Sequence, residues 1–190
     1  MSNKIKCFID IIAMIIIYLI FLYKKWRIKG KDILFVNTLM YVYLCLVLYV
    51  TLMPIIVSLP FIFNHPYTPM NLLLFNDYFT GRGDTVRQIV LNVIMMMPFG
   101  FLMPIVKKQT LFSCTVRTIL FSLSIELLQP LINGFRSADL TDVLTNTIGG
   151  IIGYLLYLLF KPIVNVIVLR FKSNSVKWGN WEVNVISNYV

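Results

Sequence analysis

Long apolar runs that alternate with short polar or basic links dominate the hydrophobicity pattern of this chain. Each run holds about 20 residues, the length that an α-helix needs to cross a hydrocarbon core of about 30 Å at 1.5 Å per residue. The pattern therefore predicts a bundle of about five transmembrane helices. Their expected ranges are 5–23, 33–57, 85–106, 111–132 and 141–160.

Composition assigns the same class. With 58% hydrophobic and 13% charged residues and a mean hydropathy of +0.81, the chain is too apolar for a soluble domain. The predicted fold class is an all-α integral membrane protein, with one transmembrane domain over residues 1–172 and a polar cytoplasmic tail over 173–190. The net charge of +9 does not indicate nucleic-acid binding, because the basic residues lie between apolar runs and form no recognisable binding patch.

Two shorter apolar segments lack the length of a transmembrane helix. Residues 70–79 lie in a long loop rich in proline and asparagine, and they are expected to form a re-entrant or interfacial segment. Residues 163–171 follow Lys161 and Pro162, and they are expected to lie in the membrane interface. Pro54 is expected to kink or end the second helix.

The distribution of Lys and Arg predicts the orientation of the helices. If the N-terminus is outside, the internal links and the tail hold 12 of the 17 basic residues, and the external segments hold five. Short cytoplasmic segments of membrane proteins carry an excess of basic residues. The chain is therefore expected to be a multi-pass plasma-membrane protein with its N-terminus outside and its C-terminus in the cytoplasm.

A set of polar and charged side chains interrupts the apolar sequence between residues 122 and 154, with one further arginine upstream. A charge near the centre of a bilayer costs about 2.5 to 3.5 kcal/mol on insertion scales, so the set needs a structural or functional reason. Spacings of three and four residues place each part of the set along one helix face. The predicted ligand-binding residues are Arg87, Glu126, Gln129, Arg136, Asp139, Asp142 and Asn146.

The predicted topology brings most of these residues toward the outer end of the bundle. Arg87 begins the third helix at that end and is the expected partner of Glu126, with Arg136 as the alternative. An interhelical polar clamp would also explain Glu126, and capping of the following helix would explain Asp139 or Asp142. A mixed site of acids and arginines would suit a phosphate-linked lipid head group, or a peptide with a free amine and carboxylate.

Glycines continue the polar face of the last predicted helix. Asn146 is followed at helical spacing by Gly149 or Gly150 and then by Gly153. Small residues let the backbones of membrane helices approach closely. The face therefore predicts close packing against another helix.

Conventional catalytic machinery is sparse in this sequence. His65 is the only histidine, and the chain contains no phosphate-binding glycine loop, so we expect neither a metal site nor a cofactor. The candidates for acid–base catalysis are the carboxylates of Glu126, Asp139 and Asp142. Whether the protein is an enzyme stays open at this point.

Two blocks of this sequence resemble the conserved blocks of the VanZ-like family of membrane proteins. The downstream block reads Glu126-x-x-Gln129, Arg136, Asp139-x-x-Asp142-x-x-x-Asn146-x-x-Gly149-Gly150-x-x-Gly153. The upstream block consists of Arg87, Leu91-Asn92 and Pro98-Phe99-Gly100-Phe101. The resemblance covers about residues 71–154, and it departs from the family where Asn71-Leu72-Leu73-Leu74-Phe75 replaces the frequent Asn-Leu-x-Pro-Phe.

The resemblance implies a protein of the bacterial plasma membrane that lowers susceptibility to teicoplanin-type lipoglycopeptide antibiotics. Its implied partners, besides the lipid bilayer, are a lipid-linked cell-wall precursor or the lipoglycopeptide itself. An enzyme acting on a lipid-linked substrate and a small lipid or solute transporter are the alternatives. Five crossings without an inverted repeat count against the transporter.

Overall fold

The computed structural model describes residues 3–62, 64, 66–132 and 136–187, and within these residues it contains helices and no strand. In chain order the elements are α1 (Asn3–Ile17), the π-helix η1 (Tyr18–Tyr23), α2 (Lys24–Lys29), α3 (Lys31–Thr51), the 3₁₀-helix η2 (Leu59–Phe61), α4 (Asn76–Phe79), α5 (Thr85–Val106), α6 (Leu111–Ile132) and α7 (Leu140–Ser187).

In the described part of the chain, five helical segments are long and apolar enough to cross a membrane. They are Lys4–Lys29, Lys31–Thr51, Thr85–Val106, Leu111–Ile132 and Leu140–Phe171. This result confirms the all-α class and the number of predicted spans. The third and fourth predicted ranges also agree with α5 and α6.

Three predicted helix boundaries are wrong. The first segment continues without a break through η1 and α2 to Lys29, and α3 ends at Thr51, three residues before Pro54. Residues 163–171, expected to form a separate interfacial segment, instead continue α7 through Pro162. A proline removes one N–H donor from a helix, and neighbouring groups in a membrane protein can compensate for that loss. The proline therefore did not end this helix.

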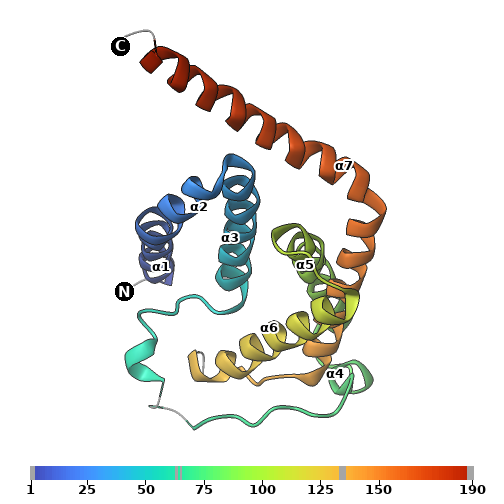
Figure 1. Cartoon of the computed structure of the whole chain (residues 1–190). Coiled ribbons are helices and arrows are strands. Elements are labelled where there is room, and N and C mark those ends of the chain that lie inside the picture. Colours follow the sequence, from blue (N-terminus) through green and yellow to red (C-terminus); the bar gives the residue numbers. More distant parts are fainter. Residues whose placement is uncertain (1–2, 63, 65, 133–135, 188–190) are drawn as a thin grey trace.

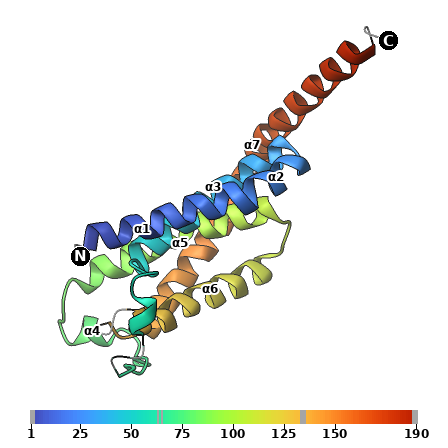
Figure 2. The same ribbon diagram turned by 90° about the vertical axis from the view of Figure 1, so that its left-hand side faces the viewer.

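The bundle is arranged around α5. Its most extensive packing is with α7, and it also packs against α3 and α6 (Figure 1). A buried cluster between these helices forms the apolar core, and the aromatic rings of Phe99 and Phe121 stack there with centroids 4.9 Å apart. α1 lies along α3 (Figure 2), on the side of α3 away from α5 and the first part of α7 (Figure 1).

Glycines bring α5 and α7 into backbone contact. A Cβ atom added to Gly153 would overlap the backbone carbonyl of Met97, and one added to Gly149 would overlap that of Val93. A Cβ on Gly150 would lie 2.6 Å from the side chain of Thr118 in α6. The predicted close approach on this glycine face is therefore confirmed, with α5 as the partner helix.

A buried carboxylate that the sequence analysis did not single out ties α1 to the bundle. Asp10 is 2% exposed. Its Oδ2 accepts a hydrogen bond from the amide of Ile55 at 2.6 Å, and its Oδ1 accepts one from the amide of Ile56 at 2.9 Å. These amides follow the end of α3 and have no helical partner of their own, so Asp10 satisfies them inside an apolar environment.

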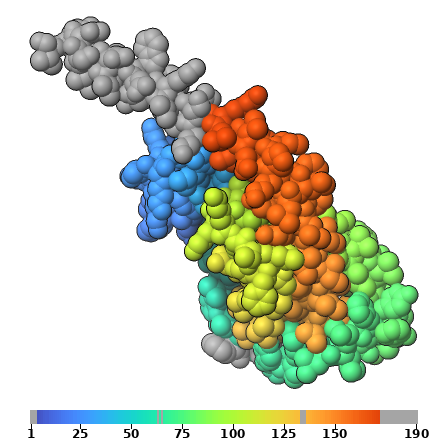
Figure 3. Space-filling model, turned by 45° about the vertical axis from the view of Figure 1, so that its right-hand side comes forward, coloured from blue at the N-terminus to red at the C-terminus, as the bar shows by residue number. Residues whose placement is uncertain are grey.

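The loop before α5 lies at the end of the bundle where α6 ends and α7 begins (Figure 2). In the space-filling view of Figure 3 it packs beside the first part of α7. Leu72 and Leu73 in this loop are 68% and 67% exposed, and Phe79 of α4 is 79% exposed. Such outward apolar side chains suit a membrane interface better than a re-entrant path through protein.

Replacing Gly153 by alanine is expected to lower both the folded yield and the thermal stability of the purified protein. The added methyl group would meet the Met97 backbone, which cannot move without separating α5 from α7. Overpacking of this kind costs about 1 to 3 kcal/mol, more than alanine gains in helix propensity. The control is Leu158→Ala, which removes a side chain that is 45% exposed. Equal melting temperatures for the two variants in the same detergent would contradict the close-packing argument.

Candidate functional site

The loop that precedes α4 is fastened to the start of α7 by its backbone. The amide of Asn71 donates to the carbonyl of Ala138 at 2.8 Å, and the amide of Leu140 donates to the carbonyl of Asn71 at 3.0 Å. The amide of Phe75 donates to Oγ1 of Thr141 at 2.9 Å. These bonds hold together two segments that lie far apart in the sequence, and the start of α7 and Asp77 of α4 contribute to the lining of a cavity.

Asp139 is the N-cap of α7. Its Oδ1 accepts a hydrogen bond from the amide of Thr141 at 2.7 Å, and its Oδ2 accepts one from Nδ2 of Asn71 at 3.3 Å. An aspartate in this position satisfies an amide that the first helical turn leaves free. The capping role that the sequence left open for Asp139 or Asp142 therefore belongs to Asp139.

Glu126 is 2% exposed and reaches the same region from α6. Its Oε2 accepts a hydrogen bond from the backbone amide of Asp139 at 3.1 Å. The glutamate thus fixes the chain at the point where α7 begins. This contact makes Glu126 an interhelical clamp, as one of the two sequence-based explanations proposed.

Arg87 does not meet Glu126, so the expected ion pair between them is wrong. The arginine is exposed, does not line the cavity, and makes no hydrogen bond or ion pair with any described residue. Its neighbour Gln88 does line the cavity. Successive residues of an α-helix point about 100° apart, and the rotation of α5 that turns Gln88 inward therefore turns Arg87 away.

Arg136, the alternative partner, lies at the rim of the site. Its Nη1 donates a hydrogen bond to the carbonyl of Thr51 at 3.2 Å. That carbonyl belongs to the last turn of α3, where a positive charge is favourable. Arg136 therefore links the end of α3 to the segment that enters α7.

A cavity of about 580 Å³ lies between these elements. All the predicted site residues except Arg87 line it. Its charged lining residues are Asp77, Glu126, Asp139, Asp142 and Arg136. The sequence predicted a mixed site with three acids and two arginines, whereas the lining holds four carboxylates and one arginine.

Two asparagine side chains extend the polar lining of the cavity. Asn146 is 1% exposed, and its Nδ2 donates to Oγ of Ser122 at 2.8 Å, while its Oδ1 has no hydrogen-bond partner. Nδ2 of Asn92 on α5 is also buried without a well-directed hydrogen bond. Buried polar atoms are nearly always paired, so Oδ1 of Asn146 is available to a ligand or to water, whereas the side chain of Asn92 lies against the carboxylate of Asp142.

Sequence reasoning did not assign several contributors to this site. Asn71 appeared only as part of a family motif, and Asp77, Gln88 and Ser122 were not assigned to the site. The helical spacing of Ser122 and Glu126 was the one available signal, because residues four apart share a helix face. Asp77 comes from another part of the chain, and no local pattern connects it to α6 or α7.

The described residues include no group of three histidine, cysteine, aspartate or glutamate side chains that could hold a metal ion. The cavity lining offers carboxylate, amide and guanidinium groups. They can bind a ligand by charge-assisted hydrogen bonds, or transfer a proton.

The fold and the cavity define a multi-pass helical membrane protein with an acidic cavity at one end of its bundle. Residues 40–161 match the VanZ/LLP1 family, and the chain belongs to this family. It is 36% identical to the protein named Protein VanZ from Enterococcus faecium over 97 residues, which is 50% of this chain and 56% of that protein. The matched segment thus covers little more than half of the relative's length. No solved structure matches this chain.

Substitutions of Asp139 and Asp142 should distinguish a residue that caps α7 from a residue that supplies charge to the cavity. Asp139→Ala is expected to cost about 1 kcal/mol of stability, in the range of a lost N-cap, whereas Asp139→Asn should cost less because asparagine also caps helices. Asp142→Asn should leave the melting temperature nearly unchanged, since Asp142 does not cap the helix. The measurement is thermal unfolding of the purified variants in detergent. A larger loss for Asp142→Asn than for Asp139→Ala would show that the roles are reversed.

Proposed function

We propose that this protein lowers susceptibility to teicoplanin-type lipoglycopeptides, and that its acidic cavity binds an amine-bearing part of the drug or of a lipid-linked envelope component. The observation that carries this proposal is the excess of carboxylates over arginine in a cavity that also presents the unpaired Oδ1 of Asn146. Membership of the VanZ/LLP1 family supports the antibiotic-resistance role.

The charge of the cavity favours one of the ligand chemistries that the sequence left open. Four carboxylates around one arginine would repel a phosphate and attract a protonated amine. Apolar side chains from α3, α5 and α6 share the lining, among them Val50, Leu91 and Ile125. A ligand with an ammonium group next to an apolar portion fits such a surface, and a peptide with a free amine has this chemistry.

The carboxylates have unequal access to such a ligand. Glu126 and Asp139 each already accept a backbone amide. Asp142 lines the cavity without capping the helix, the side chain of Asn92 lies against its carboxylate, and Asn146, one turn further along α7, presents an unpaired Oδ1. Asp142 is therefore the expected anchor for the amine, and the two asparagines are expected to orient the neighbouring part of the ligand.

Acid–base catalysis on a lipid-linked substrate is the second candidate function. One observation favours it: Glu126 from α6 and Asp142 from α7 line the same cavity. One carboxylate could accept a proton while the other donates one. In this case Asp142→Asn would abolish turnover of the substrate while leaving its binding measurable.

The orientation that we propose places the cavity at the outer face of the bacterial plasma membrane, with the C-terminus in the cytoplasm. Single cysteines in a background without native cysteines would test it, at Arg82 before α5 and at Lys108 between α5 and α6. A membrane-impermeant maleimide added to intact cells should label position 82 and not position 108. The opposite labelling would place the cavity at the cytoplasmic face.

Drug susceptibility tests the proposed function directly. Cells that express the protein should tolerate more teicoplanin than cells without it, while their tolerance of vancomycin, which lacks the lipid tail, should stay unchanged. Asp142→Asn is expected to abolish the effect, because it removes the charge of the proposed anchor. Asp84→Asn is the matched control, because Asp84 is exposed and does not line the cavity.

Protein levels in the membrane must be equal for this comparison, as measured by immunoblotting. Unchanged teicoplanin susceptibility at equal levels would refute the proposed role. An equal effect on tolerance of teicoplanin and of vancomycin would refute the proposed selectivity for the drug that carries a lipid tail.

A further inference from the structure

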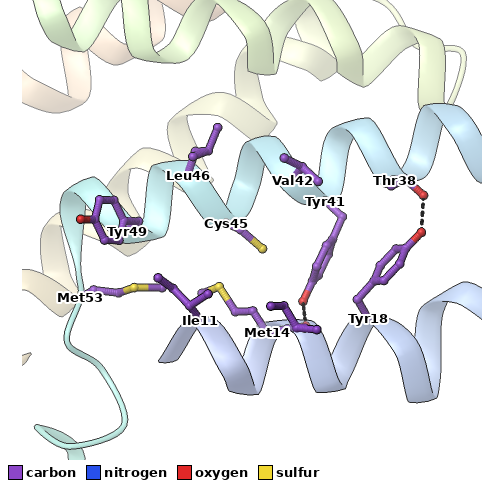
Figure 4. Close-up of a pocket in the computed structure, with 11 residues that line it drawn as sticks. Ile11, Met14, Tyr18, Thr38, Tyr41, Val42, Cys45, Leu46, Tyr49 and Met53 are labelled. Carbon is purple, nitrogen blue, oxygen red and sulfur yellow. Dashed lines mark hydrogen bonds between the residues drawn. The ribbon is translucent and has the colours of Figure 1, made fainter. Parts of the chain in front are cut away.

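An apolar groove runs between α1 and α3, on the far side of α3 from the acidic cavity. Figure 4 shows its lining side chains, with the sulfur of Cys45 directed from α3 toward α1. The groove has a volume of about 410 Å³. At one end of the groove the hydroxyl of Tyr41 donates to the carbonyl of Met14 at 2.8 Å. The hydroxyls of Tyr18 and Thr38 lie 2.8 Å apart at the same end. Polar contacts therefore join the first helical segment to α3 at this end.

The length of the groove matches one leaflet of a membrane. Its lining on α3 extends from Thr38 to Tyr49, which is about 17 Å at 1.5 Å per residue. Half of a hydrocarbon core of about 30 Å is about 15 Å. A single acyl chain of a phospholipid therefore spans the groove, whereas a long polyprenyl chain would extend beyond it.

A cationic pocket of about 400 Å³ continues the groove at its other end. Met53 lines both spaces. Lys6 of α1 and Arg136 line the pocket, and no aspartate or glutamate does. Lys6 makes no ion pair or hydrogen bond with any described residue, and Asp10, one turn further along α1, is engaged by two backbone amides.

We propose that the groove and the cationic pocket together bind one anionic phospholipid, with an acyl chain along α1 and α3 and the phosphate beside Lys6 and Arg136. The paired cations select a negative head group, because a zwitterionic lipid would bring an ammonium group that finds no carboxylate in the pocket. The site adjoins the acidic cavity and shares Arg136 with it, whereas Lys6 and the groove between α1 and α3 do not line that cavity. The site also includes α1, which lies outside the residues that match the VanZ/LLP1 family.

Lipid binding to the purified full-length protein tests this proposal. Native mass spectrometry would be used to titrate the protein in detergent with phosphatidylglycerol, phosphatidylcholine and a polyprenyl phosphate. Phosphatidylglycerol is expected to bind most tightly. Lys6→Gln should lower the affinity for phosphatidylglycerol about fivefold, as expected for one basic residue beside an anionic lipid. Lys4→Gln should leave this affinity unchanged, because Lys4 is exposed and lies outside the pocket.

The groove is tested by filling it. Cys45→Trp should remove most of the binding of phosphatidylglycerol, whereas Leu39→Trp should not, because Leu39 is 46% exposed on α3 and does not line the groove. If Cys45→Trp does not fold, the wild-type protein provides the test. Phosphatidylglycerol should then slow the reaction of Cys45 with N-ethylmaleimide but not that of Cys7, which lies outside the groove.

Three results would overturn the proposal. They are equal affinity for phosphatidylglycerol and phosphatidylcholine, tighter binding of the polyprenyl phosphate, and unchanged reactivity of Cys45 in the presence of phosphatidylglycerol. None of these measurements depends on teicoplanin susceptibility, so this proposal and the proposed function can fail separately.

Discussion

The backbone contact between α5 and α7 is the constraint on which the site depends. Lipid tails are as apolar as leucine, so membrane helices gain little from apolar contact and associate through close packing and polar contacts. Gly149 and Gly153 allow this packing against Val93 and Met97. Because Asn92 and Asn146 lie one position from Val93 and three from Gly149, the same contact aligns the two asparagines on the cavity. Separation of these helices would therefore remove both the core and the site.

Three carboxylates in this apolar chain share one structural use, which is to accept backbone amides at helix ends or in the links between helices. Asp10 accepts the amides of Ile55 and Ile56, and Glu126 accepts the amide that precedes α7. Asp139 caps α7. Since an unpaired amide or carboxylate is costly in hydrocarbon, each contact stabilises two groups at once. Asp77 and Asp142 line the cavity outside this use, and Asp142, one turn from the unpaired Oδ1 of Asn146, is the carboxylate most suited to a ligand.

Two spaces of opposite charge meet at the end of α3. The acidic cavity and the cationic pocket share four lining residues, among them Thr51 and Arg136. The hydrogen bond from Arg136 to the Thr51 carbonyl lies between them. An amine-bearing ligand and an anionic lipid could therefore bind side by side, each attracted by a different charge. Loss of the Arg136 side chain would affect both spaces, whereas Lys6 and Asp142 each belong to one.

The sequence alone determined the properties that depend on local pattern. Run length predicted five spans, glycine spacing predicted a close-packed face, and two motif blocks predicted the family and six of the residues that line the cavity. The tertiary structure decided which partner each buried group meets. Arg87 stands one position from a cavity residue but points away, because the rotation of α5 is set by its packing on α7. Asp10 binds backbone amides that follow α3, and Asp77 lines a cavity together with α6 and α7. Both contacts join segments that lie far apart in the sequence, and helical periodicity carries no information about them.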